Sequence, residues 1–335
     1  MPAPSYRVER LAFQSQALAD NPLGDPKNRE VLVVVPDGSE PDQPLPAVWM
    51  LPAYASNGVA FLNHSPWGEA LPARLERLAR TQGLPPARYI LPDVFTALGG
   101  AQYLDSPAVG RYATYLWEEL LPFLESQYAT TRRGLVGRSS GGFGALLTAM
   151  ERVGWFDAVA CHSGDMGFEW CYLPDMPTLA QVVAQAGGLE AFWTAFQAAP
   201  KKPGAWVTAM NLLAMAATYS PNPRRPPPFA CDLPVDPETL ELDESVWRRW
   251  LAWDPVRRIE KAEAQAGLRA LSLLFLDAGE RDEYRLQYGL KRFARRLSAY
   301  QIPHRWELYP DNHFQTHYRF DRSLPLVVAA LTASP

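Results

Sequence analysis

The stretch Gly134-Leu-Val-Gly-Arg-Ser-Ser-Gly-Gly-Phe-Gly-Ala145 decides how this chain folds. Its apolar beginning, Gly134 to Val136, predicts a buried strand, and the residues from Phe143 to Arg152 predict a helix. Between them lies a G-x-S-x-G pentapeptide centred on Ser139. A turn this sharp leaves no room for a Cβ two residues before or after the serine, so glycine is needed at both positions. The stretch therefore predicts a serine hydroxyl held at the edge of a sheet.

Apolar runs of strand length alternate with stretches of helical period on both sides of this turn. The expected strands are 29–35, 47–51, 89–91, 134–136, 158–161, 270–276 and 305–308, and the expected helices are 67–82, 112–128, 143–152, 284–300 and 324–331. This order predicts an α/β protein with a mostly parallel central sheet and helices on both faces. Ligands bind to such sheets beyond the carboxyl ends of the strands.

The alternation breaks between residues 166 and 267. This stretch holds expected helices at 179–199 and 205–217, three consecutive prolines at 226–228 and an acidic segment at 232–244. Roughly a hundred residues between two core strands is too long for a simple connection. We therefore predict an inserted cap at 166–267, and a core made of residues 1–165 and 268–335.

Composition limits the classes of function. Of the 335 residues, 47% are apolar and 20% charged, as in a globular protein, and the net charge of −4 gives no basic excess for nucleic acid or an anionic membrane. No apolar run approaches the roughly 18 to 20 residues of a membrane helix, and Met1 to Arg10 lack the features of a signal peptide. The three cysteines are too scattered for a disulfide framework or a metal site. We expect a cytoplasmic protein without nucleic-acid or membrane partners, and a homo-oligomer stays open.

A nucleophilic serine needs a histidine base, and the base needs a carboxylate to orient it. A G-x-S-x-G turn between strand and helix is typical of the α/β-hydrolase fold, in which the acid and then the histidine follow the serine along the chain. Of the five histidines, His313 is the expected base because it lies in the turn after the last strand. His317 is the alternative, whereas His304 and His162 are expected to be structural.

The acid is expected after the penultimate strand. Asp282 is favoured because it lies in a loop that Gly279 allows to curl toward the histidine. Asp277 and Glu280 are the alternatives, and Asp277 has a second interpretation as a strand-terminal carboxylate that binds local amides.

Two main-chain N–H groups are expected to bind an oxyanion. The N–H of Ser140 follows the nucleophile, and the N–H of Tyr54 lies in the loop after the strand 48–51. The hydroxyl of Ser140 is the competing nucleophile, but the glycine spacing centres on Ser139.

Four further residues are candidates for the substrate pocket: Gln102, Arg138, Trp170 and Tyr172. Gln102 has an alternative, purely structural role as part of a hydrogen-bonded loop. Arg138 suits either an acidic substrate end or a carboxylate of the cap. Trp170 and Tyr172 lie closest to the core strand, and their alternative role is to hold the cap together.

Several motifs along the chain resemble the esterase D / enterochelin-esterase type of α/β-hydrolase, which is related to S-formylglutathione hydrolase-like esterases. They are Ser15-x-x-Leu18, Asn21 to Pro26, Arg29, Pro92-Asp93, Gly99-Gly100-x-Gln102-Tyr103, Ser106, Gly110-x-Tyr112, Gly137 to Ala145, His162-Ser163-Gly164-Asp165, Asp277-x-Gly279-x-x-Asp282-Glu283, His313, Tyr318-Arg319 and Ser323-Leu324-Pro325. Two features depart from the family: Ala53 stands where the oxyanion strand usually ends in glycine, and the tryptophan-rich insertion varies within the family.

This resemblance implies hydrolysis of carboxylic esters by Ser139, Asp282 and His313, with no metal or organic cofactor. We therefore predict a serine carboxylesterase that hydrolyses a small or aryl carboxylic ester or thioester through an acyl-enzyme. An acyltransferase with the same triad is one alternative, and a non-catalytic α/β-hydrolase-like binding protein is the other. Binding proteins of that kind usually lack the nucleophile or the base, whereas this sequence holds all three residue types in order.

Overall fold

A central sheet of eight strands organises the computed structural model, which describes residues 5–333. The ends of the predicted core, residues 1–4 and 334–335, lie outside the described residues. The strands of this sheet are β1 (Tyr6–Gln14), β2 (Asn28–Pro36), β3 (Leu45–Leu51), β4 (Arg88–Leu91), β7 (Thr130–Arg138), β8 (Ala158–His162), β9 (Leu273–Gly279) and β10 (Arg305–Tyr309). Their order across the sheet is β1-β2-β4-β3-β7-β8-β9-β10. A separate two-stranded sheet pairs β5 (Asp105–Ser106) with β6 (Gly110–Arg111).

The sheet is mostly parallel, as predicted. From β4 to β10 every neighbouring pair is parallel, whereas β2 runs antiparallel to both β1 and β4. The edge strand β1 was not predicted, because its apolar residues do not alternate strictly. Val8 packs on one side of the sheet, and Leu11 and Phe13 pack on the other. A twisted edge strand that serves both faces loses the two-residue period by which strands are recognised.

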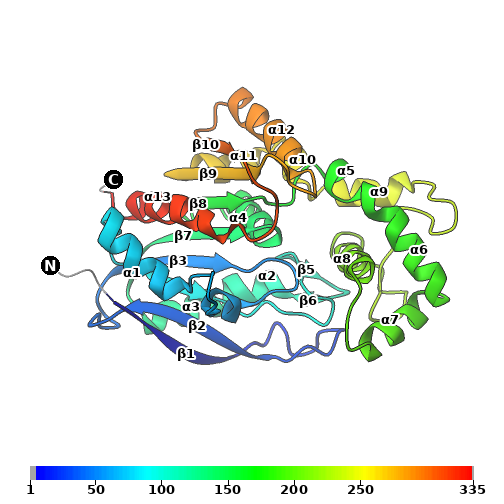
Figure 1. Ribbon diagram of the computed structural model, residues 1–335, viewed down its shortest axis with the longest axis horizontal. Coiled ribbons are helices and arrows are strands. Elements are labelled where there is room, and N and C mark those ends of the chain that lie inside the picture. Colours follow the sequence, from blue (N-terminus) through cyan, green and yellow to red (C-terminus); the bar gives the residue numbers. More distant parts are fainter. Residues whose placement is uncertain (1–4, 334–335) are drawn as a thin grey trace.

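Helices cover both faces of the sheet, and each face has its own apolar core (Figure 1). On one face lie α1 (Leu71–Gln82) and α13 (Phe320–Thr332), whose leucines and valines pack on alternate strand residues such as Val48 and Val136. The larger core on the other face includes α2 (Tyr112–Thr114), the π-helix η2 (Tyr115–Leu120), α3 (Leu121–Gln127), α4 (Ser140–Glu151) and α12 (Leu286–Ala299). The short helices η1 (Gly58–Leu62) and η4 (Thr316–Arg319) lie in connecting loops.

The stretch between β8 and β9 is helical. It holds α5 (Phe168–Cys171), η3 (Leu173–Asp175), α6 (Met176–Ala186), α7 (Leu189–Ala198), α8 (Gly204–Tyr219), α9 (Glu244–Leu251), α10 (Pro255–Arg258) and α11 (Ala262–Arg269). The helix expected at 179–199 is divided into α6 and α7, because Gly187 and Gly188 adopt positive φ angles of 86° and 116°. In Figure 1, α6 to α9 gather at one end of the molecule, apart from the helices that cover the sheet.

The last helix of this stretch belongs with the core helices in its packing. A Cβ on Gly267 of α11 would lie 2.1 Å from the carbonyl oxygen of Ala149 in α4, so the two helices approach at backbone distance. The division into a core and a cap at 166–267 stays a prediction. Within residues 5–333, no helix is both long enough and apolar enough to cross a membrane.

The register of the parallel strands brings three chain segments to one edge. Arg138 at the end of β7 pairs with His162 of β8, and His162 pairs with Asp277 of β9. The loops that follow these residues carry Ser139, Asp165 and Asp282. The sheet therefore gathers side chains from distant parts of the sequence at its carboxyl edge.

Candidate active site

Ser139 lies in a strained turn between β7 and α4. Its backbone angles are φ 56° and ψ −127°, a conformation that a residue with a side chain rarely adopts. A Cβ on Gly137 would lie 2.1 Å from the carbonyl oxygen of Gly141, and one on Gly141 would lie 2.1 Å from that of Leu51 in β3. The two glycines thus permit the turn for the predicted reason. The N–H of Ser139 donates to the carbonyl of His162 at 2.9 Å, which ties the turn to β8.

Ser139, His313 and Asp282 form a continuous hydrogen-bonded chain. His313 Nε2 is 3.1 Å from Ser139 Oγ, and His313 Nδ1 is 2.8 Å from Asp282 Oδ2. The His313 and Asp282 side chains are buried, whereas Ser139 is partly exposed. A histidine held between a serine hydroxyl and a carboxylate can take the hydroxyl proton while the carboxylate fixes the ring.

Two loops meet to build this arrangement. A Cβ on Gly279 would lie 2.5 Å from the carbonyl oxygen of Asp311 and 2.6 Å from that of Asn312, so glycine lets the acid-bearing loop approach the histidine-bearing loop. The N–H of His313 donates to Glu283 Oε2 at 2.9 Å. Arg138 Nη1 donates to the carbonyl of His313 at 2.7 Å.

The alternative residues lie elsewhere. The pKa of the His317 ring is lowered to about 4 by partial burial and by the guanidinium groups of Arg138 and Arg74. His304 Nδ1 lies 2.8 Å from the carbonyl oxygen of Ile302, and the Glu280 side chain is exposed. None of these groups has a hydrogen bond to Ser139 within residues 5–333.

Asp277 and His162 form a second histidine–carboxylate pair, which the sequence analysis missed. His162 Nδ1 is 2.7 Å from Asp277 Oδ1, and His162 Nε2 is 2.8 Å from Ser323 Oγ of α13. Arg319 Nε donates to Asp277 Oδ2 at 2.9 Å. The interpretation of Asp277 as a carboxylate that binds local amides is therefore wrong: its partners come from two distant elements.

A cavity of about 480 Å³ opens beside Ser139. It is lined by Ala53, Tyr54, Ala55, Arg138, Ser139, Ser140, Asp165, Cys171, Tyr172, Gly204, Val207, Thr208, Asn211, Tyr284, His313 and Phe314. The two predicted oxyanion donors, the N–H groups of Tyr54 and Ser140, make no hydrogen bond within the described chain. Unpaired N–H groups at a helix N-terminus and in an adjacent loop suit a developing negative charge.

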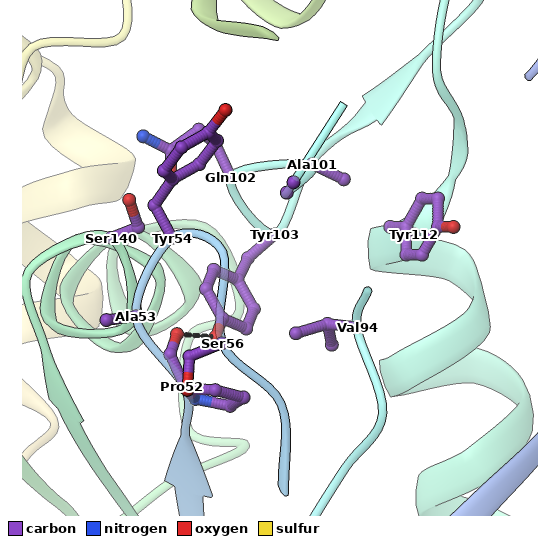
Figure 2. A pocket seen from close by; sticks show the side chains of 12 residues that line it. Pro52, Ala53, Tyr54, Ser56, Val94, Ala101, Gln102, Tyr103, Tyr112 and Ser140 are labelled. Carbon is purple, nitrogen blue, oxygen red and sulfur yellow. Dashed lines mark hydrogen bonds between the residues drawn. The ribbon is translucent and has the colours of Figure 1, made fainter. Parts of the chain in front are cut away.

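The four predicted pocket residues divide into two pairs. Arg138 and Tyr172 line this cavity, so an interaction of Arg138 with an acidic substrate end stays a prediction. Within residues 5–333 Arg138 forms no ion pair with a cap carboxylate, and its Nη1 donates to the main chain of His313. Gln102 is buried and lines a pocket of only about 10 Å³ beside the loop that follows β3, in which the Tyr103 hydroxyl donates to the carbonyl of Pro52 (Figure 2). Trp170 is 48% exposed and does not line the cavity, because its α5 position turns the ring outward to solvent.

Buried ionisable groups surround the cavity. Burial raises the pKa of the Asp165 carboxyl, although hydrogen bonds from Gln102, Tyr172 and Ser140 counteract it. Burial lowers the pKa of Arg138. Among residues 5–333, no group of three or more His, Cys, Asp or Glu side chains is arranged to hold a metal ion. The chemistry that these side chains themselves offer is nucleophilic and acid–base.

Comparisons with known proteins agree with this picture. A family model described as "Putative esterase" matches residues 26–325. No curated protein matches the sequence. Among solved structures, a ferulic acid esterase is 17% identical with a TM-score of 0.59, and the match covers 98% of this chain and 99% of that one.

Two bacterial structures are similar to the same extent. FphF of Staphylococcus aureus, a fluorophosphonate-binding serine hydrolase, is 13% identical with a TM-score of 0.58, and the match covers 98% of this chain and all of that one (100%). An S-formylglutathione hydrolase from Agrobacterium tumefaciens is 16% identical with a TM-score of 0.55, and the match covers 99% and 97% of the two chains. At these identities the likeness shows the fold, which is the predicted α/β-hydrolase fold.

Proposed function

The chain belongs to the "Putative esterase" family, and from that membership we propose that it is a serine carboxylesterase whose nucleophile is Ser139. The observation that carries the proposal is the hydrogen-bonded chain from Ser139 through His313 to Asp282, which begins at a cavity large enough for a small ester. A buried carboxylate behind the histidine and an open space before the serine are what acyl transfer needs.

The proposed reaction has two steps. Ser139 Oγ attacks the ester carbonyl carbon while His313 Nε2 takes its proton, and the N–H groups of Tyr54 and Ser140 bind the oxyanion. Collapse of the tetrahedral intermediate breaks the bond to the alcohol oxygen, which receives the proton from His313. Water then attacks the acyl-enzyme while His313 Nε2 takes its proton. Collapse of the second tetrahedral intermediate breaks the bond to Ser139 Oγ, which receives that proton as the acid leaves. Asp282 keeps Nδ1 protonated and holds the ring in place throughout.

We place substrate selection in the stretch 166–267, which we propose to act as a cap. α8 contributes Gly204, Val207, Thr208 and Asn211 to the cavity wall, and Tyr172 adds an aromatic side chain. These residues face Ser139 from outside the sheet, so they contact whichever part of the ester projects away from the nucleophile. Small or aryl carboxylic esters and thioesters fit a cavity of about 480 Å³.

The test combines labelling with turnover. A fluorophosphonate probe should attach to Ser139, as located by peptide mass spectrometry, and the protein should hydrolyse p-nitrophenyl acetate. A panel of alkyl esters, aryl esters and thioesters then identifies the preferred class. Labelling of Ser140 or Ser163 in place of Ser139, or no labelling and no turnover on the whole panel, would refute the proposal.

A further inference from the structure

Asp165 is a buried carboxylate beside the nucleophile to which the proposed reaction assigns no role. It lies three residues beyond the end of β8, is 8% exposed and lines the cavity together with Ser139 and His313. Its nearest link to the reaction is Ser140, whose N–H is a proposed oxyanion donor and whose Oγ lies 3.3 Å from Asp165 Oδ2. Asp165 is therefore one side chain away from the reacting carbonyl group.

Only one of the two carboxylate oxygens of Asp165 accepts hydrogen bonds. Oδ2 accepts from Gln102 Nε2 at 3.0 Å, from the Tyr172 hydroxyl at 3.0 Å and from Ser140 Oγ at 3.3 Å. Oδ1 has no hydrogen bond within residues 5–333, and no Arg, Lys or His in that range forms an ion pair with the carboxylate. Oδ1 is not among the fully enclosed polar atoms that lack a partner, so this oxygen is accessible from the cavity and can bind a group that enters there.

Asp254 shows what a structural carboxylate looks like in the same neighbourhood. It is completely buried, and its two oxygens accept three main-chain N–H groups, from Gly167 at 2.9 Å, Phe168 at 3.0 Å and Val256 at 3.0 Å. It does not line the cavity. Both aspartates lack a cationic partner, but only Asp165 keeps an oxygen for a group that enters from the cavity.

Two further residues of the cavity wall indicate the chemistry of that group. Thr208 and Asn211 lie three residues apart on α8, line the cavity and are partly buried. Neither side chain makes a hydrogen bond within the described chain. A carboxylate only accepts, whereas Thr208 and Asn211 can also donate, so a group that both donates and accepts satisfies all three. A hydroxyl does this, because it can donate to Asp165 and accept from Thr208 and Asn211. An ammonium can donate to Asp165 and to the side-chain oxygens of Thr208 and Asn211, but it cannot accept, so it leaves their donors unpaired.

We propose that Asp165 Oδ1, with Thr208 and Asn211, forms a subsite for a hydroxyl group of the substrate. The inference rests on the proposed esterase function and narrows its substrate class to esters with a hydroxyl a few bonds from the carbonyl, in the acyl half or the alcohol half.

Matched esters test the subsite by kcat/KM. In the acyl half, methyl 3-hydroxypropanoate is compared with the isosteric methyl butanoate. A third ester, methyl 3-aminopropanoate, tests whether the subsite prefers an ammonium group. In the alcohol half, 2-hydroxyethyl acetate is compared with propyl acetate. The wild-type protein should prefer the hydroxylated member of at least one pair by roughly 10- to 100-fold, since a site built to bind a hydroxyl rejects the analogue that lacks it.

The variants separate this role from a structural one. Asp165→Asn keeps a carbonyl for the three donors but presents an N–H donor to the cavity, so the preference should fall by about tenfold or more. Asn211→Leu, on a partly exposed helix face, should lower the same preference by a few-fold. The matched control is Asp254→Asn, which should lower the melting temperature and leave the preference unchanged.

Three outcomes would overturn the inference: equal kcat/KM within both ester pairs, an equal slowing of all esters by Asp165→Asn, or a preference for the amino ester. In each of these cases the unsubstituted esters are still hydrolysed, so the proposed esterase function survives. If the wild-type protein hydrolyses none of the five esters and Ser139 is not labelled by a fluorophosphonate, the proposed function itself fails.

Discussion

Two aspartates lie five positions apart, Asp277 in β9 and Asp282 in the loop after it, and each is hydrogen-bonded to a histidine that contacts a serine. In the arrangement at the cavity, the His313 ring nitrogens lie 2.8 Å from Asp282 and 3.1 Å from Ser139. In the enclosed arrangement, those of His162 lie 2.7 Å from Asp277 and 2.8 Å from Ser323. By hydrogen-bond distance alone the two are equivalent.

Their surroundings differ. His162 is 1% exposed, with the rings of Phe275 and Phe320 at 5.9 Å and 5.4 Å, and Ser323 is an ordinary, fully buried helical residue. Ser139 instead lies in a strained turn at the edge of a cavity. Asp277 is also bound by Arg319, whereas no arginine or lysine forms an ion pair with Asp282 within residues 5–333. The comparison teaches that access and backbone strain, more than triad geometry, distinguish a candidate nucleophile from a structural serine.

The largest expected difference is in the effect on kcat of removing the hydroxyl of Ser139 or that of Ser323. Ser139→Ala should lower kcat for ester hydrolysis by about 10⁴- to 10⁶-fold, because it removes the nucleophile and leaves only binding and the oxyanion donors. Ser323→Ala should change kcat by less than about threefold, since no ester reaches a fully buried hydroxyl. Steady-state kinetics on p-nitrophenyl acetate measures both. A comparable loss in the two variants would remove the distinction between the arrangements.

The two aspartates should separate activity from stability. Asp282→Asn should reduce kcat by about 10³- to 10⁴-fold with a small effect on folding, because the asparagine favours the wrong tautomer of His313. Asp277→Asn should lower the free energy of unfolding by about 1 to 3 kcal/mol, since Arg319 loses its charged, buried partner and keeps only Glu307. Urea denaturation checks the second effect. Near-normal activity in Asp282→Asn would argue against its role as the acid.

Trp170 and Tyr172 are close in sequence but differ in their access to the cavity, because only Tyr172 lines it. Tyr172→Ala should change the ratio of kcat/KM between small and bulky esters by about 10- to 200-fold, because Tyr172 lines the cavity. Trp170→Ala should leave that ratio unchanged, since Trp170 is half-exposed and turned away from the cavity. A chain-length series of esters is the measurement. If both variants lower all rates by a common factor, these aromatics only hold the helices together.

The smallest effects on kcat are expected for substitutions of Arg138 and Arg319. Arg138→Met removes one hydrogen bond to the main chain of His313 and should lower kcat by about three- to tenfold. Arg319→Met should leave kcat nearly unchanged and lower the melting temperature, because Arg319 contacts Asp277 and Glu307 rather than the cavity-side triad. Thermal unfolding followed by circular dichroism, with kinetics on the same preparations, tests the pair. A larger loss of kcat in Arg319→Met would couple the enclosed arrangement to catalysis.

Local chemistry made parts of this structure predictable. The strand, turn and helix from Gly134 to Arg152 depend on backbone sterics at two glycines, which the sequence states directly. The roles of Ser139, Asp282 and His313 stay predictions, but the structure brings the three side chains together. Chain order and turn residues favoured Asp282 and His313 over their competitors, because each lies in a loop at the carboxyl end of a strand.

Other features depended on contacts between distant segments. The sequence placed Trp170 and Tyr172 together beside the core, yet the direction of each side chain follows from how α5 and the residue after it pack against η3 and α12. Gln102 and Tyr103 adopt positive φ angles of 50° and 61°, and no residue type at these positions predicts that. The strand β1 escaped detection because it packs on both faces of the sheet.

The sequence by itself determined the fold class and a short set of candidate residues, because periodicity, glycine spacing and loop position are local properties of the chain. Only the tertiary structure decided which histidine–aspartate pair meets a cavity and which is enclosed, since burial depends on segments that are distant in sequence. Asp165 illustrates the same limit: its three donors come from Gln102, Ser140 and Tyr172, on separate elements. The one-sided hydrogen bonding of that carboxylate exists only once those elements are packed together.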